Sequence, residues 1–442
     1  MKPALTLAAA VLCSALAHAA DTYTVSGTQI LHNGNPQTFR GANAMHVFGG
    51  SPTEMANWNV DIVRVFIGAM RDTPLTGGPV QVGTSWLRSV QALIDANRAA
   101  GKVTILCPFG WDGTAGSMFT GMTPSAQYFY GAYKTKMRDW AMLVKNQPDV
   151  WLEVWNEPYW WNNGNGYSDA LWLSDMKTMV DNIRSTGATN IVVVPGNRQG
   201  QGEDVLLTQG RNLLAGRSNL VFDLHAYERW LEGSGEPNTD LASVETRIQS
   251  VRGKGLAVLF GEIGPMNAGA LMNPATFLKA ARRQNLTTTA WLWKYSSTDK
   301  DALLDGAGNP NNNGNNAWGS SVLNFTTGLR GAGLAADGDT STRWTTGTAQ
   351  QNGQSLTVSL GTGRSWNHLR MDMGAWSQEY PRGYKVLVSN DAVTWTEKAS
   401  GAGTAWVTDI WPGPQWSKFV RIVQTGSATV PWSIAELEVR QD

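Results

Sequence analysis

Short apolar runs alternate with amphipathic stretches from residue 21 to about residue 305, and this repeat constrains the fold more than any other feature. Such alternation is typical of βα units, whose strands pair in parallel. Eight units in about 285 residues match the size of a closed (β/α)₈ barrel, so the predicted fold class is α/β. The eight runs predicted to be strands are residues 39–43, 61–67, 103–107, 150–155, 190–195, 220–224, 257–261 and 287–293.

An open doubly wound sheet is the alternative architecture for this alternation. The first predicted strand is not followed by the Gly-rich phosphate loop that such sheets commonly carry, so the barrel is favoured. Helical periodicity between the runs is clearest at residues 85–100, 125–145, 169–185, 240–252 and 274–284.

The pattern changes after residue 305. Residues 306–316 are almost free of apolar side chains and are predicted to be an Asn/Gly-rich linker. Residues 317–442 lack long helical periodicity and show short alternating runs separated by Gly, Pro, Asn and Asp. This pattern predicts an all-β sandwich of about 126 residues, which is large enough for an independent module.

The N-terminus has the composition of a secretory signal peptide over residues 1–20. Lys2 precedes an Ala/Leu/Val stretch at 4–16, and residues 17–19 offer small side chains for cleavage. No later apolar run approaches the roughly 20 residues that cross a bilayer. We therefore expect a secreted protein, extracellular or periplasmic, whose first domain is residues 21–305. Only Cys107 remains after cleavage, so an internal disulfide is excluded.

The charge balance argues against nucleic acid or a membrane as a partner. Loss of Lys2 with the signal leaves 34 basic and 35 acidic residues, a net charge of −1. The 21 tryptophans are more informative, because indole faces stack on sugar rings, although half or more should fill the core. We expect a monomer that binds a neutral polymer.

Two glutamates carry the chemistry predicted for the barrel. Glu157 lies in WLEVWNEP (151–158) and Glu262 in LFGEIGP (259–265), and each ends a predicted strand. Barrel enzymes place their catalytic groups at these strand ends, and a pair of carboxylates suits hydrolysis of a glycosidic bond. Glu153 and Asp223 would lie deeper in the barrel, where a buried structural role is expected.

The barrel resembles glycoside hydrolase family five, within the clan of retaining (β/α)₈ hydrolases that includes cellulases and β-mannanases. The resemblance covers residues 22–305 and rests on the Asn-Glu-Pro motif and the Gly-Glu of the seventh strand. It implies that Glu157 is the acid/base, Glu262 the nucleophile and Asn156 the partner of the sugar 2-hydroxyl. Further substrate-binding residues that it implies are Arg64, His225, Tyr227 and Trp293.

Other aromatic side chains are predicted to bind distal sugars at the barrel mouth, because they follow the third, fourth and sixth strands. They are Trp111, Tyr159, Trp160, Trp161 and Trp230. The chain departs from many members of the family after the third strand, where it reads LCPFGW instead of carrying a His. His46 could contact the sugar in place of that residue, or it could pack.

The chemistry of a retaining hydrolase requires one ionised and one protonated carboxylate, about 5–5.5 Å apart. Arg64 beside Glu262 is expected to lower the pKa of that nucleophile, and its negative charge would raise the pKa of Glu157. No cofactor is expected for catalysis.

Residues 317–442 resemble discoidin-like carbohydrate-binding modules, related to the coagulation factor five/eight C-type domain, with a jelly-roll fold. The resemblance rests on DGDTSTRW (337–344), PRGY (381–384) and WSIAELEV (432–439). It implies a structural Ca²⁺ held by Asp337, Asp339, Thr342 and Glu436 with the carbonyls of Leu334 and Ala435. Trp376, Tyr380 and Trp432 are candidates for a sugar platform.

The sequence thus predicts a secreted endo-β-1,4-glycanase that acts with retention on a β-linked polysaccharide or oligosaccharide. An endoglucanase is the first expectation, a β-1,4-mannanase the second and a chitosanase the third. A transglycosylase would use the same residues, and a non-catalytic carbohydrate-binding protein is the alternative of another class.

Overall fold

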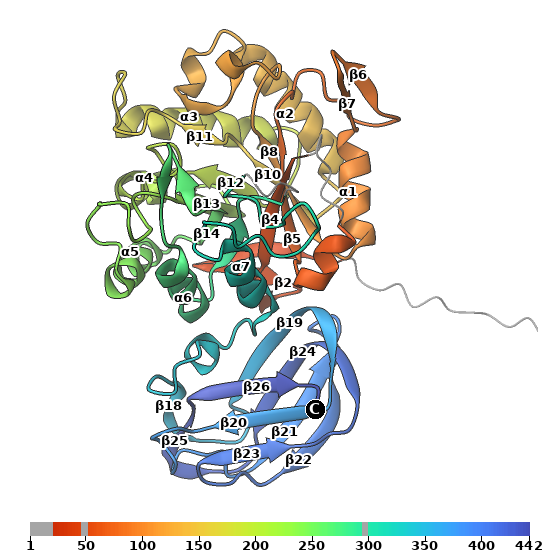
Figure 1. Ribbon diagram of the computed structural model, residues 1–442, viewed down its shortest axis with the longest axis vertical. Coiled ribbons are helices and arrows are strands. Elements are labelled where there is room, and N and C mark those ends of the chain that lie inside the picture. The colour runs from red at the N-terminus through yellow and green to blue at the C-terminus, as the bar shows by residue number, and fades with distance from the viewer. Residues whose placement is uncertain (1–20, 46–51, 294–298) are drawn as a thin grey trace, which may run out of the picture.

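The structure is a computed structural model that describes residues 21–45, 52–293 and 299–442 (Figure 1). Within these residues, eight strands pair in parallel and close into a barrel, which confirms the predicted fold class. In chain order they are β4 (Arg40–Met45), β5 (Ile62–Ile67), β8 (Val103–Pro108), β10 (Val150–Glu153), β12 (Val192–Pro195), β13 (Leu220–Ala226), β14 (Val258–Ile263) and β17 (Thr287–Ala290).

Helices cover the outside of this barrel (Figure 1). They are α1 (Val90–Ala99), α2 (Tyr130–Val144), α3 (Asp169–Arg184), α4 (Asp204–Leu214), α5 (Leu241–Gly253), α6 (Ala275–Arg283) and α7 (Trp318–Thr327). Helix α1 begins later than predicted because residues 85–87 form a strand and Ser89 caps the helix by accepting from the Ala92 amide. No helix of the described residues is both long and apolar enough to cross a bilayer.

Short strands and 3₁₀ turns lie in the loops of the barrel. The loops that follow barrel strands contain the strands β6 (Val80–Val82), β7 (Ser85–Leu87), β9 (Thr120–Met122), β11 (Glu157–Pro158), β15 (Met266–Asn267) and β16 (Ala270–Leu271). They also contain the turns η1 (Glu54–Trp58), η2 (Ala115–Ser117) and η3 (Pro124–Ala126). A small sheet, β1 (Tyr23–Ser26), β2 (Gln29–His32) and β3 (Asn35–Pro36), precedes β4. Its Ile30 packs with Phe39 and Trp151 and closes the end where the strands begin.

The C-terminal part is an antiparallel β-sandwich with its own apolar core, as predicted. One sheet has the order β19 (Ser355–Trp366), β24 (Gln415–Gln424), β21 (Tyr384–Ser389) and β22 (Thr396–Gly401). A second has β23 (Val407–Ile410), β20 (His368–Asp372) and β26 (Glu436–Arg440), and β18 (Trp344–Gln350) pairs with β25 (Ala428–Ile434). The turn η4 (Gly333–Ala336) precedes β18.

The chain at 306–316, predicted to be an Asn/Gly-rich linker, forms a compact loop against the barrel. Asn311 and Asn315 are buried there and donate to backbone carbonyls, including that of Ala302 for Asn311. Helix α7 follows, and its Trp318 and Phe325 belong to the barrel core rather than to the sandwich. The amide side chains that suggested a linker instead satisfy the backbone of a compact loop, so the change of core comes after α7, near Leu329.

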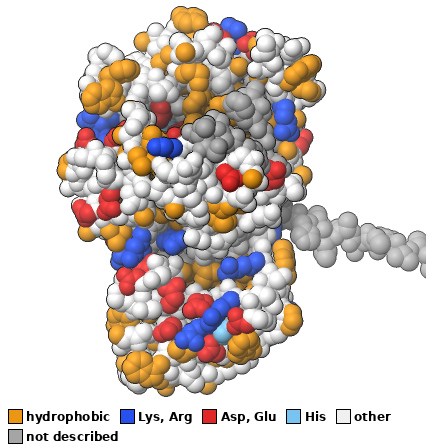
Figure 2. Space-filling view, in the orientation of Figure 1, with side chains coloured by type: hydrophobic (Ala, Val, Ile, Leu, Met, Phe, Trp, Pro, Cys, Tyr) orange, Lys and Arg blue, Asp and Glu red, His pale blue; other side chains and the backbone are white. Residues whose placement is uncertain are grey.

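A buried ion pair fastens the sandwich to the barrel. Arg330 is fully buried and its guanidinium bonds the carboxylate of Asp61, at the start of β5. Arg40, at the start of β4, donates from Nη2 to the carbonyl of Leu329 at 3.0 Å. Figure 2 shows basic side chains along the lower edge of the barrel and acidic side chains on the adjoining rim of the sandwich. The two parts therefore meet through desolvated charges.

The sandwich lies at the end of the barrel where the strands begin (Figure 1). Asn59 precedes β5 and donates to the carbonyl of Leu360, and Asn285 precedes β17 and accepts from the Gly333 amide. The strand ends that carry Glu157 and Glu262 are at the opposite end of the barrel. The sandwich therefore lies away from the end of the barrel that carries the two predicted catalytic glutamates.

Asp61→Asn should destabilise the whole chain, because it leaves the Arg330 guanidinium buried without a counter-charge. Removal of one partner of a buried pair typically costs about 3–5 kcal/mol of the free energy of unfolding. Denaturant unfolding of the full chain measures this loss. Asp72→Asn is the control, because Asp72 pairs with the exposed Arg71 and should leave stability unchanged. Equal stability of the two variants would contradict a fastening role for the pair.

Candidate active site

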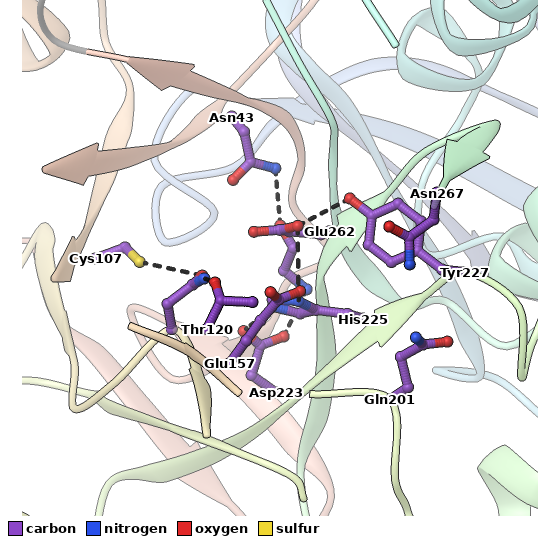
Figure 3. A network of polar contacts seen from close by, with 12 residues as sticks. Asn43, Cys107, Thr120, Glu157, Gln201, Asp223, His225, Tyr227, Glu262 and Asn267 are labelled. Carbon is purple, nitrogen blue, oxygen red and sulfur yellow. Dashed lines mark hydrogen bonds and ion pairs between the residues drawn. The ribbon is translucent and has the colours of Figure 1, made fainter. Parts of the chain in front are cut away.

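The two predicted catalytic glutamates meet at the barrel mouth (Figure 3). Glu262 belongs to β14 and is almost completely buried. Glu157 lies beyond the end of β10, in β11, whose pairing with β9 includes a bond from the Glu157 amide to the Phe119 carbonyl at 2.9 Å. At least one carboxylate oxygen of each lies within 4.8 Å of the other and of a ring nitrogen of His225.

Arg64 is the centre of the hydrogen-bond network beneath these acids. Its Nε and Nη2 each donate to Glu153 at 2.7 Å, and its Nη1 donates to Glu262 Oε1 at 2.7 Å. Nη2 also donates to Asn156 Oδ1 at 2.8 Å, and Nη1 to Asn43 Oδ1 at 2.9 Å. The side chain is fully buried, so every one of these acceptors compensates a desolvated charge. Glu153 has the buried structural position that the sequence predicted.

Histidine and tyrosine from β13 and the segment after it complete the network. His225 Nδ1 is 2.9 Å from Glu157 Oε1, and Nε2 is 3.5 Å from Asp223 Oδ2. Tyr227 donates its hydroxyl to Glu262 Oε2 at 2.8 Å. Asp223 itself is buried and accepts from the Gly261 amide at 2.6 Å. A side chain at Gly261 would overlap the Asp223 carboxylate, so only glycine fits immediately before Glu262.

The pKa of Glu262 differs from the sequence prediction, in which Arg64 lowers it. Burial raises the pKa of Glu262, and the charges of His225 and Arg64 oppose that rise without overcoming it. The charge of Arg64 thus lowers the pKa of Glu262, as predicted, but burial raises that pKa by more. For His225, burial alone would lower the pKa, yet Glu262, Asp223 and Glu157 together raise it well above its ordinary value. The acids around His225 therefore favour its protonated form, in which Nδ1 donates to Glu157.

Four of the aromatic residues predicted to bind sugar lie in the core instead. Trp111 stacks on Phe129 with ring centroids 5.4 Å apart, and Trp230 packs edge-on against Phe260. Tyr159 is buried and donates to Asp175 Oδ2 at 3.0 Å. Each of these three residues follows a strand in the sequence, but its side chain packs into the barrel core instead of facing solvent.

Trp293 is the fourth, and its position corrects the predicted eighth-strand platform. It is buried and packs edge-on against Trp58 at 5.2 Å. The eighth strand ends at Ala290, three residues earlier than Trp293, so the residue that directly follows the strand is Trp291. Trp291 is half-buried, donates its amide to the Ile263 carbonyl beside Glu262, and stacks with Phe109 at 5.8 Å. Trp291 and Phe109 both pack on Phe66, and neither was among the predicted platforms.

Two predicted platforms remain accessible. Trp160 and Trp161 are 43% and 59% exposed, and both follow Glu157 by a few residues. Trp160 also lies against Gly121, in the strand that pairs with the acid/base segment. His46 lies outside the described residues.

A polar cluster in the loops after the strands was not among the predicted site residues. Glu228 Oε2 accepts from Gln201 Nε2 and from Asn267 Nδ2, each at 3.0 Å. These residues come from the loops after three consecutive strands, β12, β13 and β14. The sequence could have indicated these residues only through their positions just after the ends of predicted strands.

The predicted calcium ligands lie where η4 and the start of β26 meet. Asp337 Oδ2 accepts from Thr342 Oγ1 at 2.9 Å, and Glu436 Oε2 accepts from the Gly338 amide at 3.3 Å. Burial raises the pKa of Glu436 to about 7, and the negative charge of Asp337 adds to the rise. Two hard carboxylates that repel each other in this way fit a divalent cation.

Leu334 lies in η4 and Ala435 lies between β25 and β26, on the same two segments as Asp337 and Glu436. Two of the predicted ligands also pair with basic residues of α6. Asp337 Oδ2 lies 3.6 Å from Arg283 Nε, and the carboxylate of Asp339, which also accepts from Ser341, lies 3.2 Å from Lys279 Nζ.

Comparison with protein families identifies the barrel. The model described as cellulase (glycosyl hydrolase family 5) matches residues 36–297. The chain belongs to glycosyl hydrolase family 5. It is a glycoside hydrolase, as the two mouth carboxylates predicted, and the F5/8 type C domain matches residues 316–437 of its C-terminal module. Both family resemblances inferred from the sequence are confirmed.

Similar proteins include several mannan-degrading enzymes. Mannan endo-1,4-beta-mannosidase of Cellvibrio japonicus (strain Ueda107) is 24% identical over 337 residues, which cover 73% of this chain and 71% of that protein. The enzyme of the same name from Salipaludibacillus agaradhaerens is 25% identical over 39% of this chain and 52% of its own length. The catalytic domain of a mannanase from Streptomyces sp. SirexAA-E has the same fold, with a TM-score of 0.53 and 20% identity over 72% of this chain and 94% of its own.

Replacement of His225 should change the pH dependence of catalysis. The positive charge of His225 lowers the pKa of Glu262, so its loss in His225→Gln raises that pKa further. Because the nucleophile must be ionised, the acidic limb of the kcat/KM profile should move to higher pH. His368→Gln, at a histidine of the module with two carboxylate neighbours, should leave the limb in place. An unmoved limb in His225→Gln would contradict this account.

Proposed function

We propose that the enzyme hydrolyses β-1,4-mannan within the chain, with retention of anomeric configuration. The observation that carries the mechanism is the pair of carboxylates at the barrel mouth, in which both oxygens of Glu262 are held, Oε1 by Arg64 and Oε2 by Tyr227. The substrate rests on the relatives named mannan endo-1,4-beta-mannosidase, which favour mannan over the glucan first expected from the sequence.

In the first step a Glu262 oxygen attacks the anomeric carbon while the bond from that carbon to the leaving oxygen breaks. Glu157 gives its proton to the leaving oxygen, so the sugar chain departs as an alcohol and Glu262 carries a glycosyl ester. Arg64 and Tyr227 fix the nucleophile for attack, since each bonds a different carboxylate oxygen.

In the second step Glu157, now ionised, takes a proton from water. The water oxygen bonds to the anomeric carbon and displaces Glu262, which returns to the carboxylate form. Arg64 and Tyr227 stabilise the negative charge that reappears on Glu262. His225 donates from Nδ1 to Glu157 through both steps, and so orients it toward the leaving oxygen and the water.

The roles of the two acids can be separated with a substrate whose leaving group needs no proton. Glu157→Ala should slow hydrolysis of mannan by about 10²–10⁴-fold, the usual contribution of a general acid. With an aryl β-mannoside that has an acidic phenol, the burst of released phenol should persist, because only the second step needs the general base. Glu262→Ala should lose both reactions. A normal burst in Glu262→Ala, or none in Glu157→Ala, would contradict the assignment.

The substrate is decided by reducing-sugar release from mannan, cellulose, lichenan and chitosan in parallel. Glucose and mannose differ in the configuration of one hydroxyl at C2, whose partner in this site is expected to be Asn156, held by Arg64. We expect the highest kcat/KM on mannan, with weaker activity on β-glucans. Beta-mannanase/endoglucanase A of Caldicellulosiruptor saccharolyticus is 26% identical over 182 residues, which cover 40% of this chain and 13% of that protein, and its name makes glucan the second candidate. Faster hydrolysis of cellulose than of mannan would overturn the proposed substrate.

We further propose that residues 1–20 direct secretion and that the module binds Ca²⁺ between Asp337 and Glu436. Calcium would stabilise the module by neutralising the two carboxylates, so EDTA should lower the melting temperature of the full chain. Glu436→Gln should abolish the effect of EDTA, whereas Glu438→Gln, next to the site but paired with Arg440, should retain it. Identical melting with calcium and with EDTA in the parent chain would contradict the metal site.

A further inference from the structure

The module carries a hollow of about 480 Å³ on its four-stranded sheet, away from its predicted calcium site. It lies between the end of β21, the turn at 389–395, the start of β22 and the start of β24. Polar side chains line most of it, and Trp416 forms one wall. The volume is within the range of about 300–1,000 Å³ that is typical of ligand sites.

Trp416 presents an open indole to this hollow. The side chain is 52% exposed, and its Nε1 has no hydrogen-bond partner among the residues that the structure describes. Its inner edge rests on Gly363 of β19, where any side chain would come within 2.6 Å of the ring. Gly363 has a φ of +102°, which also favours glycine. Gly363 thus lies against the ring, while about half of the Trp416 side chain stays exposed.

The turn opposite Trp416 is rigid. Asp391 Oδ1 accepts from Ser389 Oγ, from the Val393 amide and from the Thr394 amide, at 2.7–2.9 Å. Ser389 Oγ in turn accepts from the Ala392 amide at 2.9 Å. These bonds fix the shape of the wall before any ligand arrives, and such preorganisation reduces the entropy lost on binding.

The polar groups of the hollow suit a neutral ligand with many hydroxyls. Lys398 and Asp391 bring one charge of each sign, so the lining has no net charge. Asn390 uses its carbonyl oxygen to accept from the Lys418 amide, and its NH₂ has no partner in the described part of the chain. Thr394 and Thr396 add exposed hydroxyl groups. An apolar ring face beside such donors and acceptors matches the two surfaces of a pyranose.

The aromatic residues first considered in the module are less available. Trp432 is fully buried. The ring of Trp376 is covered by the Arg343 guanidinium at 4.5 Å, and that of Tyr380 by Arg382 at 3.7 Å. Trp395, although next to the hollow, is covered by Arg421 at 3.9 Å.

We propose that the hollow beside Trp416 binds a segment of a neutral β-linked glycan chain, with one sugar ring stacked on the indole. The identification of that glycan as mannan rests on the proposed function. The existence of the binding site does not depend on it. The turn of the hollow is fixed to the barrel, because Asn33 and Asn35 donate to the carbonyls of Asp391 and Ala392. The site would hold the enzyme on a polymer in a fixed orientation, separate from the cleft that cuts it.

Calorimetric titration of the full chain carrying Glu262→Gln tests this site. The probes are mannohexaose, cellohexaose and N-acetylchitohexaose, and at least one should bind in two events, one in the cleft and one in the module. Trp416→Ala in the same background should weaken the module event by about tenfold or more and leave the cleft event unchanged. Trp416→Tyr should restore most of the affinity, because a ring is again present.

Trp406→Ala is the matched control, because Trp406 is 62% exposed but does not line the hollow. Equal isotherms for Trp416→Ala and Trp406→Ala, or a single binding event with every probe in the parent, would overturn the proposal. With Glu262 restored, Trp416→Ala should slow hydrolysis of insoluble polymer several-fold and leave hydrolysis of soluble hexaose unchanged. Failure of the catalytic mechanism would appear instead as residual activity of Glu262→Gln and would leave the module event in place.

Discussion

The active site depends on one buried cation, the guanidinium of Arg64. A charge taken fully out of water is tolerated only when surrounding groups compensate it. Arg64 meets this condition with acceptors from three other barrel strands and from the segment after β10, and these acceptors include Glu262 itself. The same bonds that make the cation stable in the barrel hold the nucleophile and Asn156 in place. Fold stability and catalytic geometry therefore share one set of contacts.

His225 lies between the two catalytic acids, which favour its protonated form. It lies within 2.9 Å of a Glu157 oxygen and 3.6 Å of a Glu262 oxygen. Its charge favours the ionised form of the deeply buried Glu262 and its hydrogen bond orients Glu157. Desolvation, which by itself would protonate the nucleophile, is thus opposed from two sides, by Arg64 below and His225 beside it. The two ends of the barrel have different roles, because the catalytic glutamates lie at one end and the module is attached at the other.

The sequence predicted what depends on strand periodicity and on residue type. All eight barrel strands and the placing of Glu157 and Glu262 at strand ends follow from apolar alternation, since the ends of parallel strands share one edge. The positions of Trp111, Trp230 and Trp293 did not follow, because each lies in or beyond a loop whose path decides whether an indole faces solvent or core. The compactness of the loop at 306–316 did not follow either, because its asparagines bond backbone carbonyl groups, a role that composition does not reveal.

The central claim is that Glu262 attacks the anomeric carbon directly while Glu157 protonates the leaving oxygen. Proton NMR of the anomeric region during the first minutes of oligosaccharide hydrolysis tests it, because two displacements at one carbon preserve its configuration. The account predicts that the β-anomer of the new reducing end appears first and that the α-anomer grows later by mutarotation. Initial formation of the α-anomer would mean a single displacement by water, and would contradict the account.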